Sequence, residues 1–194
     1  MSEARTMGLR ERKARQLRQQ IVDTALRLFT QNGYENVTID QIAADVEVSS
    51  RTINRIFGTK EEILLAEEAE LCELLRTGIH SSQSTGAFTV ALDAFHALDA
   101  VLVDRRDDLI LLQRLIDSSP ALVGRVLTKY ASWEEEIGTL LAERFALPPA
   151  AARLIAGVAL VCWRNAFSEW LTESTHRSLG ETIDRTVTVL RTGL

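Results

Sequence analysis

The segment from Thr38 to Lys60 constrains the fold of this chain more than any other part of the sequence. It contains two short stretches whose apolar residues recur at helical spacing and so mark one buried face of each. These residues are Ile39, Ile42, Ala43 and Val46 in the first stretch, and Ile53 and Phe57 in the second. Only Asp45–Val48 lies between the stretches, which leaves room for a tight turn. Two helices joined in this way predict a helix-turn-helix, whose second helix can enter the major groove of DNA.

Both short helices begin with residues that favour helix capping. Thr38 is followed three residues later by Gln41, which is the pattern of a capping box. Ser49 or Ser50 can cap the second helix, because a hydroxyl oxygen accepts from the free backbone N–H groups of the first turn. The two helix starts are therefore marked independently of the apolar pattern.

The charge of the chain is distributed unevenly. The net charge is -5, yet residues 1–60 carry ten Lys and Arg against seven Asp and Glu. The basic residues concentrate before residue 21, at Arg5, Arg10, Arg12, Lys13, Arg15 and Arg18. A basic head on an acidic body indicates that the head meets a polyanion. The alternative is a charged arm that is only solvated, which is less favoured beside a helix-turn-helix.

The whole chain is predicted to be helical, because no run of residues alternates with period two between hairpin turns. We expect a serine-rich loop at 78–86. Besides the two short helices, the expected helices cover 12–32, 60–76, 87–104, 109–117, 120–145, 149–172 and 179–192.

Cysteine usage and hydropathy indicate a cytoplasmic protein. Cys72 and Cys162 lie in helical patterns without CxxC spacing, which favours reduced thiols over a disulfide framework. The N-terminus has charges where a signal peptide would need an apolar run. The apolar run Leu154–Cys162 is too short to span a bilayer, so no membrane association is expected.

The first part of the chain resembles the TetR family of transcriptional regulators. The matching residues are Thr38, Ile42-Ala43, Val48-Ser49, Thr52, Phe57 and Thr59-Lys60-Glu61, together with LFTQNGYENVT at 28–38 and the basic GLRERK at 8–13. Beyond about residue 65 the resemblance is one of layout, although Trp133, Arg153 and WRNAFSEW at 163–170 are similar to the mycofactocin-type regulators. The resemblance implies an all-α fold, with a three-helix helix-turn-helix domain at 1–60 and a helical effector-binding and dimerisation domain at 61–194.

The sequence departs from the family pattern at four positions of the helix-turn-helix. Glu47 holds a turn position that is usually glycine, where a left-handed backbone costs energy for any other residue. Arg51 replaces a frequent glycine, and Asn54 and Ile56 replace frequent aromatics. These changes leave the expected fold intact and leave the target DNA sequence open.

The resemblance implies two kinds of DNA contact. Contacts to phosphates position the protein, and contacts to base edges read the sequence. Phosphates would be held by Lys60 and by the hydroxyls of Thr38, Ser49, Ser50 and Thr52. Bases would be read by the outward side chains Arg51, Asn54 and Arg55, since Arg suits a guanine edge and Asn an adenine edge. For either arginine, contact with phosphate alone is the competing interpretation. The arm Arg5–Lys13 would follow the DNA backbone or enter a minor groove.

The larger domain is expected to hold a small, largely apolar effector that releases the DNA. The residues predicted to line its pocket are Phe95, Tyr130, Trp133, Trp163 and Asn165, with His96 and Arg114 as further polar candidates. Core packing is the competing interpretation for each aromatic residue. The helix at 60–76 joins the two domains, so it would transmit the effector signal.

We expect a homodimer formed through the last two helices. The predicted contact residues are Ala152, Ile155, Ala156, Ala159, Leu160, Ile183, Val187 and Leu190, because small and branched apolar residues allow close helix approach.

A helical metal-dependent enzyme and a structural adaptor are the rival classes. Asp93 and His96 have i, i+3 spacing, which alone is weak evidence for a metal site. No HExxH motif, nucleophile elbow or glycine-rich phosphate loop occurs in the chain. The sequence therefore predicts a regulator without catalytic residues, metal or cofactor.

Overall fold

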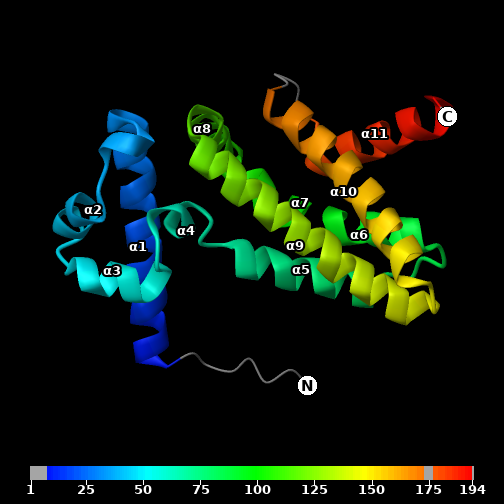
Figure 1. The fold of residues 1–194 in the computed structure, drawn as a ribbon, viewed down its shortest axis with the longest axis horizontal. Helices are drawn as coiled ribbons and strands as arrows, with labels where there is room; N and C mark the ends of the chain where they lie inside the picture. The colour runs from blue at the N-terminus through cyan, green and yellow to red at the C-terminus, as the bar shows by residue number, and fades with distance from the viewer. Residues whose placement is uncertain (1–7, 173–176, 194) are drawn as a thin grey trace. The chain divides into compact units, whose positions relative to one another are not determined.

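The computed structural model describes residues 8–172 and 177–193, and within these ranges all regular structure is helical (Figure 1). The predicted all-α class is confirmed. The helices are α1 (Leu9–Asn32), η1 (Tyr34–Asn36), α2 (Ile39–Asp45), α3 (Ser50–Phe57), α4 (Lys60–Leu64), α5 (Glu68–Ser81), α6 (Ala87–His96), α7 (Asp99–Leu102), η2 (Val103–Arg105), α8 (Arg106–Ser118), α9 (Pro120–Phe145), α10 (Pro149–Thr172) and α11 (Leu179–Gly193).

The chain forms two compact units. The first comprises Met1–Ala66 together with Arg114–Leu122, and the second comprises Glu67–Gln113 together with Val123–Leu194. The junction between α8 and α9 therefore belongs to the first unit. There Ser119 is buried and its hydroxyl donates to Glu35 Oε1 at 2.9 Å.

The core of the first unit forms where α2, α3 and α4 pack against α1 (Figure 1). The apolar residues predicted to lie on one face of each helix form this core, because each short helix can bury only one face. The buried residues include Ile21, Ala25 and Phe29 of α1, Ile42 and Ala43 of α2, Ile53 and Phe57 of α3, and Ile63 of α4. These contacts confirm the predicted helix-turn-helix.

The predicted caps and turn are also confirmed. Thr38 Oγ1 accepts from the backbone N–H of Gln41 at 3.3 Å, and Gln41 Oε1 accepts from that of Thr38 at 2.8 Å, which completes the capping box. Ser49 caps α3 by accepting from the N–H of Thr52 at 3.2 Å. Glu47 has φ 58, so the turn uses a left-handed residue at the position where the family usually has glycine.

The predicted helix at 60–76 is wrong as a single element. α4 ends at Leu64, three turn residues follow, and α5 begins at Glu68. Ile63 and Leu64 are buried in the first unit, whereas Glu67 and Glu68 pair with Arg105 and Arg125 in the second. The helix breaks where the contacts of the chain pass from the first unit to the second. Neither glycine nor proline occurs at this break, so the sequence gives no sign of it.

The predicted helix at 87–104 is also divided, into α6, α7 and η2. A tertiary contact explains the break, because Asp99 accepts from the backbone N–H of Leu179 at 3.2 Å, at the start of α11. His96 Nε2 lies 3.1 Å from Asp184 of the same helix. His96 ends α6 and Asp99 begins α7, and both side chains reach α11, which a continuous helical pattern could not reveal.

The loop predicted at 78–86 is shorter than expected, since α5 continues to Ser81. Gly78 is a buried helical residue rather than a loop residue. A Cβ atom on it would lie 2.7 Å from the Cα of Ala94, so the missing side chain lets α5 and α6 cross closely.

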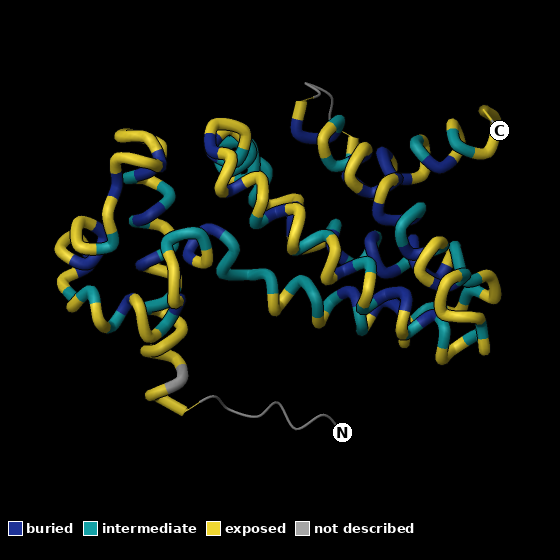
Figure 2. The backbone as a smooth tube through the Cα atoms, in the orientation of Figure 1, coloured by how far each residue is buried: buried dark blue, intermediate teal, exposed yellow. Residues whose placement is uncertain are grey.

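Helix α10 packs against α6 and α11 through its small residues. The predicted dimer residues Ala152, Ala156, Ala159, Leu160, Ile183 and Val187 are buried within the chain itself, so that part of the prediction is wrong. Small residues do allow close approach here, but to helices of the same chain. Figure 2 shows buried and exposed positions alternating along α10. Although α10 is long and apolar enough to cross a membrane by length and composition, it is a core helix of the second unit.

Because Glu47 is left-handed, we expect Glu47→Gly to raise the free energy of unfolding by about 0.5–1 kcal/mol. Urea denaturation followed by circular dichroism measures the change. Glu47→Gln is the matched control, since it removes the charge and keeps the Cβ atom. An equal gain in both variants would contradict a backbone origin.

Candidate nucleic-acid interface and effector site

The outward face of α3 carries the three side chains predicted to read bases. Arg51, Asn54 and Arg55 are exposed, while Ile53 and Phe57 on the opposite face are buried. In the described ranges, no hydrogen bond or ion pair engages these three polar side chains. A guanidinium or amide held on a rigid helix and left unpaired is suited to contact a base edge or a phosphate.

The hydroxyl residues predicted at phosphates hold the motif together. Besides the two caps, Ser49 Oγ and Thr52 Oγ1 lie 2.9 Å apart, and Ser50 donates to Asp40 of α2. Thr38 and Ser49 remain exposed. Their oxygen atoms stabilise the starts of α2 and α3, which orients the outward face of α3.

Lys60 has a different environment from the one predicted. Its Nζ donates to the backbone oxygens of Tyr34 at 2.8 Å and Val37 at 3.1 Å, and it lies 4.0 Å from the centre of the Tyr34 ring. These contacts direct the ammonium into the first unit. Lys60 ties the start of α4 to the segment that leads into α2.

The neighbouring residue Glu61 completes this connection. Tyr34 donates its hydroxyl to Glu61 Oε1 at 2.5 Å. Burial is the main cause that raises the pKa of Tyr34, and its hydrogen bond lowers the pKa of Glu61. The pair therefore stays a neutral phenol and a carboxylate at neutral pH.

Arg18 is a structural residue that sequence reasoning counted with the basic arm. Its guanidinium donates to the backbone oxygens of Ala66 at 2.7 Å and Ile56 at 3.4 Å, and lies 4.4 Å from the centre of the Phe57 ring. Of the arm itself, Arg5 lies outside the described residues, and Leu9–Lys13 forms the first turn of α1. Arg10, Arg12, Lys13 and Arg15 are exposed.

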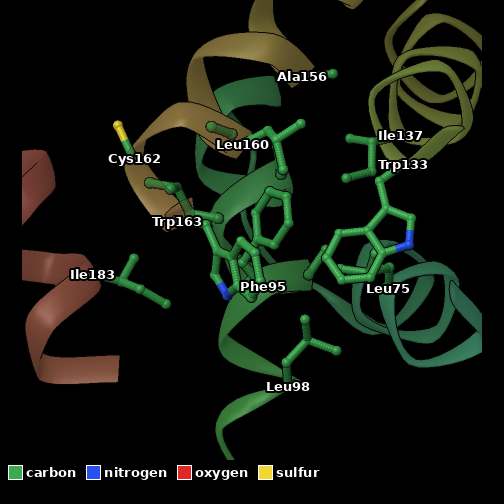
Figure 3. Close-up of a cluster of buried hydrophobic side chains, with 14 of the residues drawn as sticks. Leu75, Phe95, Leu98, Trp133, Ile137, Ala156, Leu160, Cys162, Trp163 and Ile183 are labelled. Atoms are coloured by element: carbon green, nitrogen blue, oxygen red, sulfur yellow. The ribbon is translucent and has the colours of Figure 1, made fainter. Parts of the chain in front are cut away.

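The second unit contains a continuous cluster of aromatic rings. The ring centres of Phe95 and Trp163 lie 5.5 Å apart, those of Trp133 and Trp163 lie 5.4 Å apart, and those of Tyr130 and Trp133 lie 6.0 Å apart. Phe167 stacks on Trp163 at 4.9 Å. Four of the five predicted pocket residues are thus brought together, and Figure 3 shows Phe95 beside the two indoles.

The remaining polar candidates lie outside this cluster. Asn165 is exposed, and its amide donates to the backbone oxygen of Val161 at 2.8 Å. His96 pairs with Asp184, and Arg114 is an exposed residue of the first unit. Asp93 accepts from the hydroxyls of Ser82 and of Ser84, the latter at 2.8 Å, so it does not pair with His96 in a metal site.

The structure adds Lys129, which sequence reasoning missed. Its ammonium lies 5.0 Å from the centre of the Trp133 ring and 5.1 Å from that of Tyr130. Burial lowers the pKa of Lys129 to about 8, with Glu68 opposing the change. The spacing of Arg125, Lys129 and Trp133, four residues apart on one helical face, was the available signal.

Because Lys60 donates to two carbonyls, we expect Lys60→Ala to lower the free energy of unfolding by about 1–3 kcal/mol. Arg51→Ala and Arg55→Ala should leave it within about 0.5 kcal/mol, since both side chains are exposed and unpaired. Thermal and urea unfolding test this contrast. Unchanged stability in Lys60→Ala would mean that the ammonium faces outward in solution.

Because the pKa of Lys129 is lowered in the folded chain, we expect this residue to make the free energy of unfolding increase with pH. The unfolded chain binds more protons than the folded one between pH about 8 and 10.5, so this group makes stability rise with pH. From pH about 7 to 9 we expect its contribution to rise by about 1 kcal/mol, measured as the difference between the natural chain and Lys129→Met. Burial raises the pKa of Cys72 and of Tyr130, which keeps these neighbours neutral longer. Lys13→Met, at an exposed position, should show no such difference.

Comparisons with known proteins agree with this architecture. Residues 21–66 match the model of bacterial regulatory proteins of the tetR family, and residues 86–194 match the MftR C-terminal domain. The chain is 34% identical to the HTH-type transcriptional regulator TcmR of Streptomyces glaucescens over 71% of its own length and 64% of that protein, less than two thirds of the relative. It is 29% identical to the putative mycofactocin biosynthesis transcriptional regulator MftR of Mycobacterium tuberculosis over 90% of its length and 89% of that protein.

A solved structure shows the same fold. The transcriptional regulator FadR from Bacillus subtilis, in complex with stearoyl-CoA, has a TM-score of 0.60 and 19% identity, covering 91% of this chain and 98% of that one. The helix-turn-helix match lies within the first unit, and the effector-domain match covers residues 86–194, more than half of the chain. The chain therefore belongs to the TetR family of bacterial transcriptional regulators, with a C-terminal domain of the MftR type.

Proposed function

We propose that this regulator is a cytoplasmic repressor that binds a palindromic operator as a homodimer and is released by a small apolar ligand. The observation that carries the proposal is the outward face of α3, where Arg51, Asn54 and Arg55 are exposed and unpaired beside a buried apolar face. In this proposal, residues 1–60 form the DNA-binding domain and residues 61–194 form the domain for ligand binding and dimerisation.

The assignment of contacts follows from which side chains are free. Arg51, Asn54 and Arg55 have no partner in the described structure and are our base-reading residues. Ser49, Ser50, Thr52 and Thr38 hold the helix starts, so their hydroxyls would donate to phosphate only as a secondary role. Lys60 acts mainly by orienting α2 and α3, because its donors are already engaged.

Dimerisation would use the apolar residues of the last two helices that remain exposed. Leu154 is 69% exposed, Val161 53% and Val189 64%. Leu154 and Val161 are seven residues apart and so share one face of α10. Two copies would bury these faces against each other in an isologous contact, which places two α3 helices for one palindrome. Partly buried Ile155 and Leu190 can contribute at its edge.

The aromatic cluster supports the effector proposal. Phe95, Tyr130, Trp133 and Trp163 present a large polarisable interior, which favours an apolar ligand. The FadR relative was solved with stearoyl-CoA, so this fold can hold a long apolar chain. A ligand shifts the DNA-binding equilibrium by its differential affinity for the two states. Three connections join the units along the chain, after Ala66 and at the two ends of Arg114–Leu122, and each can carry the change.

The test of DNA recognition begins with selection of operator sequences by the natural chain. Arg51→Ala and Arg55→Ala should each cost about 1–3 kcal/mol in binding and relax the preference at particular base pairs, measured by fluorescence anisotropy. Binding should weaken steeply with salt, since phosphate contacts release counterions. Unaltered base preference in both variants would place the reading residues elsewhere.

The test of dimerisation is the double variant Leu154→Glu with Val161→Glu. Charges on this face should yield a monomer by light scattering and lower operator affinity, while the circular dichroism spectrum stays helical. Leu127→Glu is a control on a different exposed apolar residue, 51% exposed, that we do not place in the interface. A natural chain that is monomeric at micromolar concentration would refute the homodimer.

A further inference from the structure

Two neighbouring hydrogen-bond donors on α9 have no acceptor within the described ranges. The indole Nε1 of Trp133 is buried and unpartnered, and the whole residue is only 1% exposed. Lys129, one helical turn earlier on α9, contacts the faces of Trp133 and Tyr130, and no hydrogen bond or ion pair is formed by its ammonium in the described ranges. Both donors therefore belong to one small region of the unit.

The charged groups around this region do not satisfy the ammonium. On α5, Glu68 is the nearest source of negative charge, but its carboxylate pairs with Arg125 of α9 at 2.8 Å. Cys72, also on α5, lies beside the Trp133 indole, but burial raises its pKa, so it is a neutral thiol and at most a weak acceptor. Arg164 of α10 lies 4.8 Å from the centre of the Tyr130 ring and adds a second cation, which is exposed to solvent. Of these two cations without an ion pair, Lys129 is the less exposed.

Leaving such donors without acceptors is costly. An unsatisfied buried N–H costs about 1–3 kcal/mol, and a partly exposed ammonium packed on aromatic rings loses part of its hydration without an ion pair in return. Replacing Lys129 by an apolar residue would remove this cost, so the natural residue is unfavourable for stability alone. A group that accepts hydrogen bonds and carries negative charge would satisfy both donors together.

The two tryptophans do not share this role. Trp163 Nε1 is also buried and unpartnered. Figure 3 shows the indole nitrogens of Trp133 and Trp163 pointing away from each other, so one small head group cannot meet both. Lys129 lies on the Trp133 side of the cluster.

We propose that the effector is a singly anionic amphiphile, whose one carboxylate accepts hydrogen bonds from Lys129 Nζ and Trp133 Nε1 while its apolar body packs on the aromatic cluster. This inference rests on the proposed ligand-responsive function and specifies the class of ligand. One carboxylate matches Lys129, because Arg125 already pairs with Glu68 and Arg164 is exposed to solvent. A polyanionic head would be repelled by the nearby Glu68 carboxylate.

Matched pairs of probes test the proposal on the full chain without DNA. Benzoate, naphthoate and anthroate are compared with the corresponding neutral arylmethanols by quenching of tryptophan fluorescence, and hits are confirmed by calorimetry. At least one of the acids should bind about tenfold more tightly than its alcohol or better. Equal affinity for acid and alcohol throughout the series, or binding of neither, overturns the proposal.

Variants separate the two donors from general packing. Lys129→Met should lower affinity for the acid by roughly 10- to 100-fold and leave the alcohol unchanged, because the variant keeps the apolar stem. Trp133→Phe keeps a ring and removes the N–H, so affinity for the acid should fall by about fivefold. Arg164→Met is the control cation beside Tyr130 and should have little effect. Loss of acid binding in Arg164→Met but not in Lys129→Met overturns the assignment.

Release of the operator is measured separately with the same compounds. An acid that binds through Lys129 but leaves DNA affinity unchanged supports this site and refutes the proposed induction. A neutral ligand that releases the operator equally from the natural chain and Lys129→Met supports the induction and refutes this site. Thermal unfolding and circular dichroism of each variant establish that it is folded before binding is compared.

Discussion

The DNA-binding unit depends on one cation held by backbone oxygens. Lys60 donates to the carbonyls of Tyr34 and Val37, and the adjacent Glu61 accepts from the Tyr34 hydroxyl. Two consecutive residues at the start of α4 thereby hold the segment that leads from α1 into α2. The short helices α2 and α3 bury few residues each, so their orientation relies on such links as well as on the core. The exposed arginines of α3 can act in recognition because other groups carry the structure.

The effector unit is organised around the small residues of α10. Ala152, Ala156 and Ala159 are fully buried, which lets α10 approach α6 and α11 closely. Bulky rings then gather along the same helix farther on, where Trp163 and Phe167 stack. Helix α10 thus combines close helix packing at one end with a cluster of aromatic rings at the other. Lys129 and Trp133 supply the polar features of that interior.

Much of the fold and part of the candidate site could be predicted from sequence. The helix-turn-helix, its caps, the left-handed Glu47 and the aromatic residues of the cluster all depend on local pattern, which is legible in a single chain. The dimer residues were misassigned because an apolar face does not reveal whether its partner is the same chain or another. Lys60 and Arg18 were read as surface cations, since their backbone acceptors lie far away in sequence.

The sequence by itself determined the helical class, the helix-turn-helix and the membership in a regulator family, because helical periodicity, capping residues and a compact motif are local properties. Only the tertiary structure decided where the long helical patterns break, at Leu64 and at His96, and which charged side chains pack against aromatic rings. Those outcomes depend on partners such as Leu179 for Asp99 and Trp133 for Lys129. Contacts between distant residues and the desolvation of a charge follow from packing in three dimensions, which no local pattern encodes.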